Sequence, residues 1–348
     1  MNAVMIAEAS ATRRTIDATH LCSLIDAFLA DKKRRCSHRT YENYLNDLQP
    51  FLKWWNECGH TFHHELSETV FNGFIRHLET DYRNAFGRQA TTYTKWRVTK
   101  RVRQILIYAH HRGFVPVSIF ELCPLYKDCE RLKFYPTAQE LYHVILAAEG
   151  ETRLRDAALI AFAISTGARR FELANARMEH LVFDTPTTNV RVGDIHTGYI
   201  RLLKVKGDAE GKGIGRVSVF DSVAGLLLKI YLRSVNRTEG TVFGVTDTQM
   251  FNIVERLGKR AGIDEIHPHA FRSALVDYWS DYHHKSGHMA DLALKMQVGH
   301  TVPKDDPIYR YIDTRNEAKT LRRIREFHTS PLLSMPWNWA EWPVHVEA

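Results

Sequence analysis

No long hydrophobic run occurs in the sequence. A membrane-spanning helix needs about 18 or more consecutive apolar residues without charges, and no stretch of the 348 residues meets this requirement. The opening residues, MNAVMIAEASATRR, hold too few apolar side chains in a row for the hydrophobic core of a signal peptide. We therefore expect a cytoplasmic protein that has no membrane partner.

Cysteine is scarce as well. The chain has five cysteines, an odd number, and all of them lie between Cys22 and Cys129. That is not the pattern of a disulfide framework, and it fits a reducing compartment. The stretch CGHTFHH, which begins at Cys58, mixes cysteine and histidine but lacks the paired spacing of a zinc site, so we expect no metal.

Nucleotide-binding motifs are also missing. The glycine-rich stretch GDAEGKGIG, residues 207–215, contains a Gly-Lys pair, but no Ser or Thr follows it to open a helix. A P-loop needs that arrangement to hold phosphates and magnesium. We expect no nucleotide and no other cofactor.

Acidic residues are absent from one long stretch. No Asp or Glu occurs between Asp81 and Glu121, whereas eight Lys and Arg do. Residues 1–133 hold 20 Lys and Arg against 14 Asp and Glu, and the remainder holds 27 against 26, so the N-terminal part carries most of the net charge of +7. Such a run is either a solvated helix face or a phosphate-binding surface. The candidate DNA contacts are Arg88, Lys95, Arg97, Lys100, Arg101 and Arg103.

Helical periodicity dominates the N-terminal part. LCSLIDAFLA predicts one helix, and Ser37 can cap a second, in which apolar residues from Tyr41 to Trp55 recur at the spacing of a buried stripe. TVFNGFIRHLET and TTYTKWRVTKRVRQILIYAHHRG predict two more helices. We therefore expect a disordered start over residues 1–20, an all-helical domain over residues 21–125 and a polar linker over residues 126–136.

The pattern changes after the linker. Thr137 and Glu140 can form the capping box of a helix, and Gly167 can end a buried one. YIRLLKVKG and GRVSVFD have strand character, and the glycine-rich stretch between them predicts a hairpin. Pro268 suits the first position of a later helix. The sequence predicts a mainly α chain with a small antiparallel β-sheet, in an α+β domain over residues 137–327 that is followed by a Trp-rich tail over residues 328–348.

Four separate segments of the second domain carry candidate functional residues. They hold, in order, Arg169, Lys206, His269 with Arg272, and His300 with Tyr309. Taken singly, each has a plain structural explanation, such as a surface ion pair for the first arginine or a place at the edge of the core for the tyrosine. The order and spacing of the whole set are more specific than any single residue.

This set resembles the signature of tyrosine recombinases, the phage-integrase family. TGARRFEL resembles the family's TGxRxxEL, HPHAFR resembles its HxxR box, and VGHTVPKDDPIY resembles its Gly-His with a nucleophilic tyrosine nine residues later. VKG before the hairpin resembles the strand that presents the family's lysine, and residues 24–55 are similar to its helical core-binding domain. The resemblance covers about residues 21–325 and implies the integrase-like fold for both domains.

The resemblance also implies cleavage and rejoining of DNA through a 3′-phosphotyrosine bond. A phenol is a poor nucleophile at neutral pH and needs a base and a cationic site, while two guanidinium groups match the phosphoryl oxygens in geometry. The implied roles are nucleophile for Tyr309, transition-state stabilisation for Arg169 and Arg272, proton transfer for His269 and Lys206, phosphate binding for His300, and orientation of the site for Glu172.

Two of these assignments have rivals. Lys204 lies on the same face of the predicted strand as Lys206, and Lys212 lies in the turn, so either could be the lysine. Tyr311 could replace Tyr309, although two residues along a helix turn a side chain by about 200°. The sequence also departs from the family at Ser273, where a histidine is common, and at Val298, where leucine is common.

The leading hypothesis is a simple two-domain site-specific recombinase for integration, excision or resolution. With about 20 residues before Leu21, we expect no separate arm-binding domain. The expected partners are double-stranded recombination sites and three further copies in a homo-tetramer, and the expected location is the nucleoid. The alternatives are a non-catalytic DNA-binding or architectural protein on the same scaffold and a type IB topoisomerase.

The tail predicts an intersubunit contact. Trp337, Trp339 and Trp342 must be buried somewhere, either on their own domain or elsewhere. Since the family often docks its C-terminal segment on a neighbouring protomer, we expect exchange of this tail within the tetramer.

Overall fold

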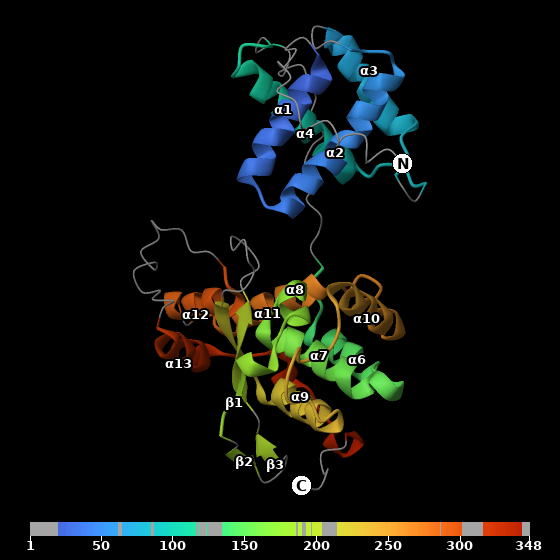
Figure 1. Cartoon of the computed structure of the whole chain (residues 1–348). Helices are drawn as coiled ribbons and strands as arrows, with labels where there is room; N and C mark the ends of the chain where they lie inside the picture. The colour runs from blue at the N-terminus through green and yellow to red at the C-terminus, as the bar shows by residue number, and fades with distance from the viewer. Residues whose placement is uncertain are drawn as a thin grey trace. The chain divides into compact units, whose positions relative to one another are not determined.

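The computed structural model divides into two compact units, residues Met1–Leu132 and Lys133–Ala348 (Figure 1). The division falls inside residues 126–136. The residues that the structure describes are 20–61, 65–84, 87–115, 118, 123, 134–185, 187–189, 193–195, 197–203, 214–285, 287–300 and 316–342.

The N-terminal unit is helical. Its described helices are α1 (Leu21–Arg35), α2 (His38–Glu57), α3 (Glu68–Thr80) and α4 (Thr92–His110). The Ser37 side chain accepts a hydrogen bond from the Thr40 N–H at 3.3 Å, which confirms the predicted cap. The apolar stripe of α2 packs into one core with the other three helices, including the fully buried Phe51 and Trp55.

A second unit surrounds the buried helix α7 (Arg153–Thr166). The helices α6 (Ala138–Leu146), α9 (Ser222–Ser234), α10 (Asp247–Arg260) and α11 (Pro268–Tyr282) contribute to the same core. The predicted capping box of Thr137 and Glu140 is present, and Pro268 stands at the first position of α11. The short helix α8 (Arg170–Ala174) follows α7 and ends earlier than the stretch ARRFELANAR predicts.

The predicted hairpin forms a three-stranded antiparallel sheet with one additional strand. β4 (Gly198–Leu203) pairs with β5 (Ile214–Phe220) on one side and with the short β1 (Leu181–Phe183) on the other. A separate two-stranded ribbon joins β2 (Thr187–Asn189) to β3 (Gly193–Ile195). The prediction of a mainly α chain with a small antiparallel sheet is confirmed.

Two further helices lie against β5. They are α12 (His288–Val298) and α13 (Glu317–Phe327), and Figure 1 shows them beside the sheet. Val217 and Val219 of β5 share a core with Leu275 and Trp279 of α11 and with the inner residues of these two helices. The sheet therefore has helices packed on it next to the segments that hold the predicted site.

Trp342 of the tail is buried on its own domain, and Trp337 and Trp339 are half-buried against the same core, while exchange of the tail between protomers stays a prediction. Trp342 is 4% exposed, with the Arg153 guanidinium 4.6 Å from its ring centroid. The Trp337 indole N–H donates to the Leu332 carbonyl at 2.9 Å, and its ring stacks on Trp339 at 5.2 Å between centroids. All three rings therefore pack on the core of the second unit. Residues 343–348 lie outside the described residues.

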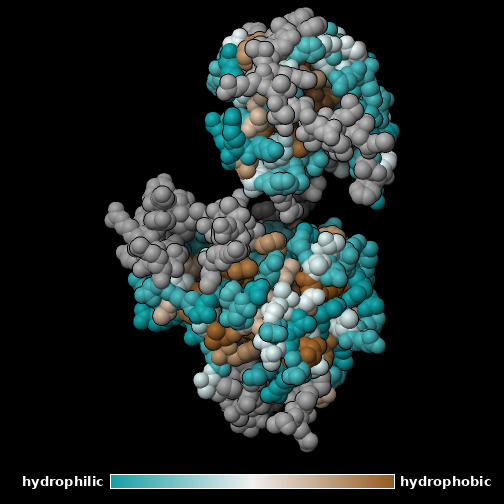
Figure 2. Space-filling model, in the orientation of Figure 1, coloured by the Kyte–Doolittle hydropathy of each residue, from teal (hydrophilic) through white to brown (hydrophobic). Residues whose placement is uncertain are grey.

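Within the described ranges, no helix combines the length and the apolar character that crossing a bilayer requires. Figure 2 shows mostly hydrophilic residues on the visible face of both units, with small scattered hydrophobic patches.

Candidate active site

Arg169 stands at the start of α8 because Gly167 ends α7. Gly167 adopts a left-handed conformation with φ of 58°, which glycine accepts at little cost, and the chain then turns directly into α8. The Arg169 N–H donates to Glu172 Oε2 at 2.7 Å, and the guanidinium Nη1 donates to Glu172 Oε1 at 2.9 Å. The Arg169 side chain keeps 43% of its surface exposed, so a guanidinium that Glu172 holds through Nη1 can still be reached by a ligand.

Glu172 is buried and shared by two arginines. Its side chain is 4% exposed, and besides Arg169 it accepts a hydrogen bond from Arg216 Nη2 at 2.9 Å. Burial alone would raise the pKa of this carboxyl, but the charges and hydrogen bonds of Arg216 and Arg169 outweigh that effect and the pKa is lowered. Glu172 is therefore a carboxylate at neutral pH, and it holds the side chains of Arg169 and Arg216.

Sequence reasoning missed Arg216, an arginine in the middle of the candidate site whose side chain is 9% exposed. It lies on β5, and besides its bond to Glu172 it donates through Nη1 to the Gln297 carbonyl at the end of α12. Burial lowers its pKa, and the charge of Glu172 opposes that effect. The signal in the sequence was weak, because both faces of β5 are buried and strand alternation does not show which side a charged residue occupies.

Gly299 and His300 approach the arginines from α12. Gly299 ends this helix with φ of 65°, and its carbonyl lies 3.4 Å from Arg169 Nη2. A Cβ atom on Gly299 would come within 2.4 Å of Arg216 Cδ, so glycine is needed here for space as well as for conformation. Burial lowers the pKa of His300, and the charges of Arg272, Arg169 and Arg216 lower it further. The imidazole is therefore neutral at pH 7.

Arg272 is the buried cation of the site. It is 3% exposed, and its Nη1 donates to the Gly167 carbonyl at 2.8 Å. Its Nη2 is buried and has no hydrogen-bond partner among the residues that the structure describes. Burial, with the charges of Arg216 and Arg169, lowers its pKa to about 9, so the guanidinium is still charged at neutral pH. A buried cation with a spare donor is an environment that an anion would stabilise.

His269 is exposed in the first turn of α11, three residues before Arg272. The helix is capped by another histidine, His267, whose Nδ1 accepts from the Ala270 N–H at 2.9 Å. The structure thus brings together Arg169, Glu172, Arg272 and His300, with His269 on the helix that carries Arg272. The candidate lysines and tyrosines lie outside the described residues: Lys206 with its rivals Lys204 and Lys212, and Tyr309 with its rival Tyr311.

The predicted DNA contacts lie on or near α4, but they are not equivalent. Arg97 and Arg101 both bind the buried carboxylate of Asp47 on α2, at 2.6 Å and 3.2 Å, and the Arg101 guanidinium lies 4.0 Å from the Tyr44 ring centroid. Their charge therefore compensates a carboxylate of their own unit. Lys100 lies over the Trp96 ring at 4.3 Å and is exposed. The other three predicted contacts are Arg88, before α4, and Lys95 and Arg103 on it.

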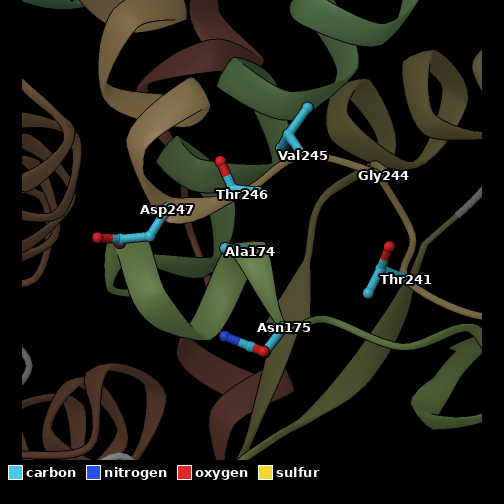
Figure 3. A pocket seen from close by; sticks show the side chains of 7 residues that line it. All are labelled: Ala174, Asn175, Thr241, Gly244, Val245, Thr246 and Asp247. Carbon is cyan, nitrogen blue, oxygen red and sulfur yellow. The ribbon is translucent and has the colours of Figure 1, made fainter.

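The structure also contains a surface hollow of about 450 Å³ (Figure 3). It lies where α8 ends and the chain enters α10, and its lining includes Asn175, Thr246 and Asp247. The only charged group in the lining, Asp247, is already paired with Arg170 at 2.7 Å. Arg169 lies at the opposite end of α8, so the hollow is separate from the arginine cluster.

Across the described ranges there is no group of three or more His, Cys, Asp or Glu side chains placed to hold a metal ion. Of the stretch CGHTFHH, the structure describes the residues up to Thr61. His60 lies 4.8 Å from Trp55 between ring centroids and packs against it.

Comparison with known proteins shows the fold but no close relative. No family model and no curated protein sequence matches the chain. Among solved structures, a lambda integrase (residues 75–356) dimer bound to a COC′ core site aligns with a TM-score of 0.58 over 81% of this chain and 96% of that one, at 13% identity. XerH recombinase bound to its difH substrate aligns with a TM-score of 0.51 over 86% and 82%, at 14% identity.

The chain has the integrase fold. The Tn1549 transposon integrase in complex with a circular intermediate DNA aligns likewise, with a TM-score of 0.50 over 88% of this chain and 94% of that one, at 13% identity. The resemblance to tyrosine recombinases that the sequence motifs indicate is thus confirmed at the level of the fold.

Proposed function

We propose that the protein is a tyrosine-type site-specific recombinase that cleaves and rejoins double-stranded DNA through a 3′-phosphotyrosine bond. The arginine cluster is the observation that carries this proposal. Arg169 can be reached by a ligand, and Arg272 is buried with a spare donor, while the one buried carboxylate beside them is already shared by two arginines. A phosphodiester supplies the negative charge that such a site would bind.

The first chemical step would be attack on phosphorus by the Tyr309 hydroxyl oxygen. A new bond forms between the tyrosine oxygen and phosphorus, the bond from phosphorus to the 5′ oxygen breaks, and His269 helps to take the tyrosine proton. Lys206 gives a proton to the leaving 5′ oxygen. Arg169 and Arg272 stabilise the negative charge that develops on the phosphoryl oxygens.

His300 would act as a neutral hydrogen-bonding group to the phosphate. Its pKa is lowered by burial and by the neighbouring arginines, so it adds no further charge at pH 7. In the second step a free 5′-hydroxyl of the other strand attacks the phosphotyrosine, and the tyrosine leaves. The phosphoester bond energy is kept, so strand exchange needs no nucleotide.

The N-terminal unit would bind the DNA on which the site acts. Lys100, with its ammonium over the exposed edge of Trp96, and the basic residues Arg88, Lys95 and Arg103 offer phosphate contacts. Arg97 and Arg101 remain proposed contacts, with part of their charge engaged by Asp47. One solved neighbour is a lambda integrase tetramer bound to a Holliday junction, and we include a homo-tetramer on paired sites in the proposal.

Covalent trapping tests the proposal. Nicked duplex fragments from the encoding replicon are incubated with the wild type, with Tyr309→Phe and with the matched control Tyr311→Phe, and adducts are detected on a denaturing gel. We expect adducts with the wild type and with Tyr311→Phe, and none with Tyr309→Phe, because only one of the two hydroxyls can face the phosphate.

Other outcomes would redirect the assignment. Specific binding to one fragment without any adduct would contradict the recombinase and support a DNA-binding protein on this scaffold. Relaxation of a supercoiled plasmid that lacks every bound fragment would support a type IB topoisomerase. Adducts that persist in Tyr309→Phe and vanish in Tyr311→Phe would exchange the roles of the two tyrosines.

A further inference from the structure

The hairpin strands β4 and β5 each carry an arginine that leaves the sheet to bind another element. In the antiparallel register, Leu202 pairs with Arg216 and Arg201 pairs with Val217. Because neighbouring residues of a strand point to opposite faces, Arg201 and Arg216 extend from opposite faces of the hairpin. One hairpin thus offers two cationic groups to two different partners.

Arg216 binds the chain just before residues 301–315. Its Nη1 donates to the carbonyl of Gln297, whose own side chain is buried and bonded to β5 through the Val219 N–H at 2.9 Å and the Val219 carbonyl at 2.8 Å. The last turn of α12 is therefore fixed to β5 by side chains from both elements. His300, the last described residue before the gap, follows this turn by two residues.

Arg201 binds the chain just after the same residues. Its Nε donates to Glu317 Oε2 at 2.8 Å and its Nη2 donates to Glu317 Oε1 at 2.7 Å, a bidentate pair. Arg201 Nη2 also lies 3.3 Å from the Tyr199 hydroxyl. The hydrogen bond from Arg201 lowers the pKa of Glu317, and the reciprocal bond raises the pKa of Arg201. Glu317 is the first residue of α13.

Connectivity gives these contacts a functional meaning. Tyr309 lies nine residues after His300 and eight before Glu317, and Lys206 lies five residues after Arg201 and ten before Arg216. Lys206 and Tyr309 therefore each lie in a chain segment that is tied to the β4–β5 hairpin at both ends. The segment of Lys206 connects the two strands, and the segment of Tyr309 runs between α12 and α13, which are bonded to them. A bidentate pair fixes distance and orientation together, which loose packing does not.

We infer that Arg201 and Glu317 form a positioning pair that couples the strand leading to Lys206 with the chain that follows Tyr309. The inference rests on the proposed function for its effect on DNA cleavage. Arg216 and Gln297 fix the end of α12, which precedes Tyr309, so both segments are joined to the β4–β5 pair at their described ends. The side chains of the pair are 29% and 36% exposed, and such pairs add little to global stability, which separates positioning from folding.

Charge reversal tests the pair. Arg201→Glu and Glu317→Arg each place like charges together, whereas the double variant restores an ion pair with its polarity exchanged. On a nicked duplex that gives an adduct with the wild type, we expect each single variant to cleave about tenfold more slowly at saturating DNA, because small misplacements of reacting groups are costly. The double variant should recover most of the rate, and DNA affinity in a gel-shift assay should stay unchanged.

Arg260→Glu is the matched control. Arg260, at the end of α10, also forms an exposed ion pair, with Glu149 at 2.8 Å, and neither residue belongs to the β4–β5 hairpin or to α13. It should leave the cleavage rate unchanged. Single variants that cleave like the control, or a double variant no faster than the singles, would overturn the inference.

Hydrogen exchange of the DNA-free protein gives a readout that does not depend on activity. We expect Glu317→Arg to raise exchange in the peptide over residues 204–213 as well as in its own peptide, and the double variant to restore both. Exchange that changes only around residue 317 would also overturn the coupling. If the wild type forms no adduct on any duplex, the proposed function fails, and this measurement still decides whether the coupling exists.

Discussion

Each unit of the protein contains a buried carboxylate shared by two arginines, and the two sites differ in what surrounds them. In the N-terminal unit Asp47 binds Arg97 and Arg101; in the C-terminal unit Glu172 binds Arg169 and Arg216. Only the second site has a further buried guanidinium, Arg272, with a donor that no described residue accepts.

The difference separates an internal ion pair from a ligand site. Around Asp47, one guanidinium stacks over Tyr44 and the other keeps 44% of its side-chain surface in contact with water, so both positive charges are accommodated. Around Glu172 the protein places three guanidinium groups near one carboxylate, and two of them are largely shielded from water: Arg272 is 3% exposed and the Arg216 side chain 9%. Such an excess is destabilising by itself, and a site that binds an anion is where it is useful.

Removal of the shared carboxylate should produce the largest difference in stability loss between the two units. Glu172→Gln leaves the largely shielded Arg216 without its counter-charge. We expect the unfolding free energy of the C-terminal unit to fall by about 3–5 kcal/mol. Asp47→Asn should cost about 1–3 kcal/mol, because its arginines stay partly hydrated. Native-state hydrogen exchange in core peptides of α7 and of α2 measures each unit separately. Equal losses in the two units would remove the proposed distinction.

Replacing an arginine should have opposite effects in the two units. Arg272→Gln removes a buried charge, and burial together with the neighbouring arginines lowers the pKa of that group to about 9. We therefore expect the C-terminal unit to gain about 1 kcal/mol of stability, while adduct formation falls at least about 100-fold. Arg101→Gln removes a paired and stacked charge and should lower the stability of its unit. A large loss of stability in Arg272→Gln would mean that its bond to the Gly167 carbonyl outweighs the charge penalty.

The sequence predicts those parts of this comparison that depend on local pattern. The caps at Ser37 and Thr137, the stop at Gly167 and the first-turn Pro268 follow from residues within one turn of each other, and the structure confirms them. Family motifs also indicated Arg169, Glu172, Arg272 and His300, which lie together in the structure.

The parts that depend on tertiary contact could not be predicted. Asp47 meets its arginines from 50 or more residues away in sequence, so the basic run of α4 did not show that two of its members are engaged. Arg216 lies on a strand with two buried faces, where alternation carries no information. The sequence also does not show on which apolar surface the tail tryptophans pack. In the folded protein they pack on the core of their own unit.

A glycine substitution tests whether the side chain of Arg216 has a fixed position in the C-terminal unit. Gly299→Ala combines a left-handed backbone with a Cβ atom 2.4 Å from Arg216 Cδ, whereas Gly262→Ala, with φ of 75°, meets nothing within 4 Å. Both should lose about 1 kcal/mol from backbone strain, and Gly299→Ala should lose about 1–3 kcal/mol more from crowding. Thermal unfolding and adduct formation measure the excess. Equal losses would show that Arg216 moves aside freely.

The smallest expected effect is a change in the pKa of His300, which reports the positive electrostatic field of the site. Burial lowers the pKa of His300, and Arg272 is the first of the charges that add to the shift. Titration of the His300 ring by NMR should therefore give a pKa below 6.5 in the wild type and a higher value in Arg272→Gln, with no change in the control Arg325→Gln.

The same shift has a consequence for stability with a defined sign. Since the folded pKa of His300 lies below 6.5, the unfolded chain takes up its proton first, so stability is full above pH 6.5 and declines as the pH falls through the folded pKa. That decline should shrink in Arg272→Gln, because the imidazolium then forms beside one cation fewer. If neither the pKa of His300 nor the decline of stability with pH changes, Arg272 exerts no electrostatic field at His300. The arginines of the C-terminal unit would then act as isolated ion pairs, as those of the N-terminal unit do.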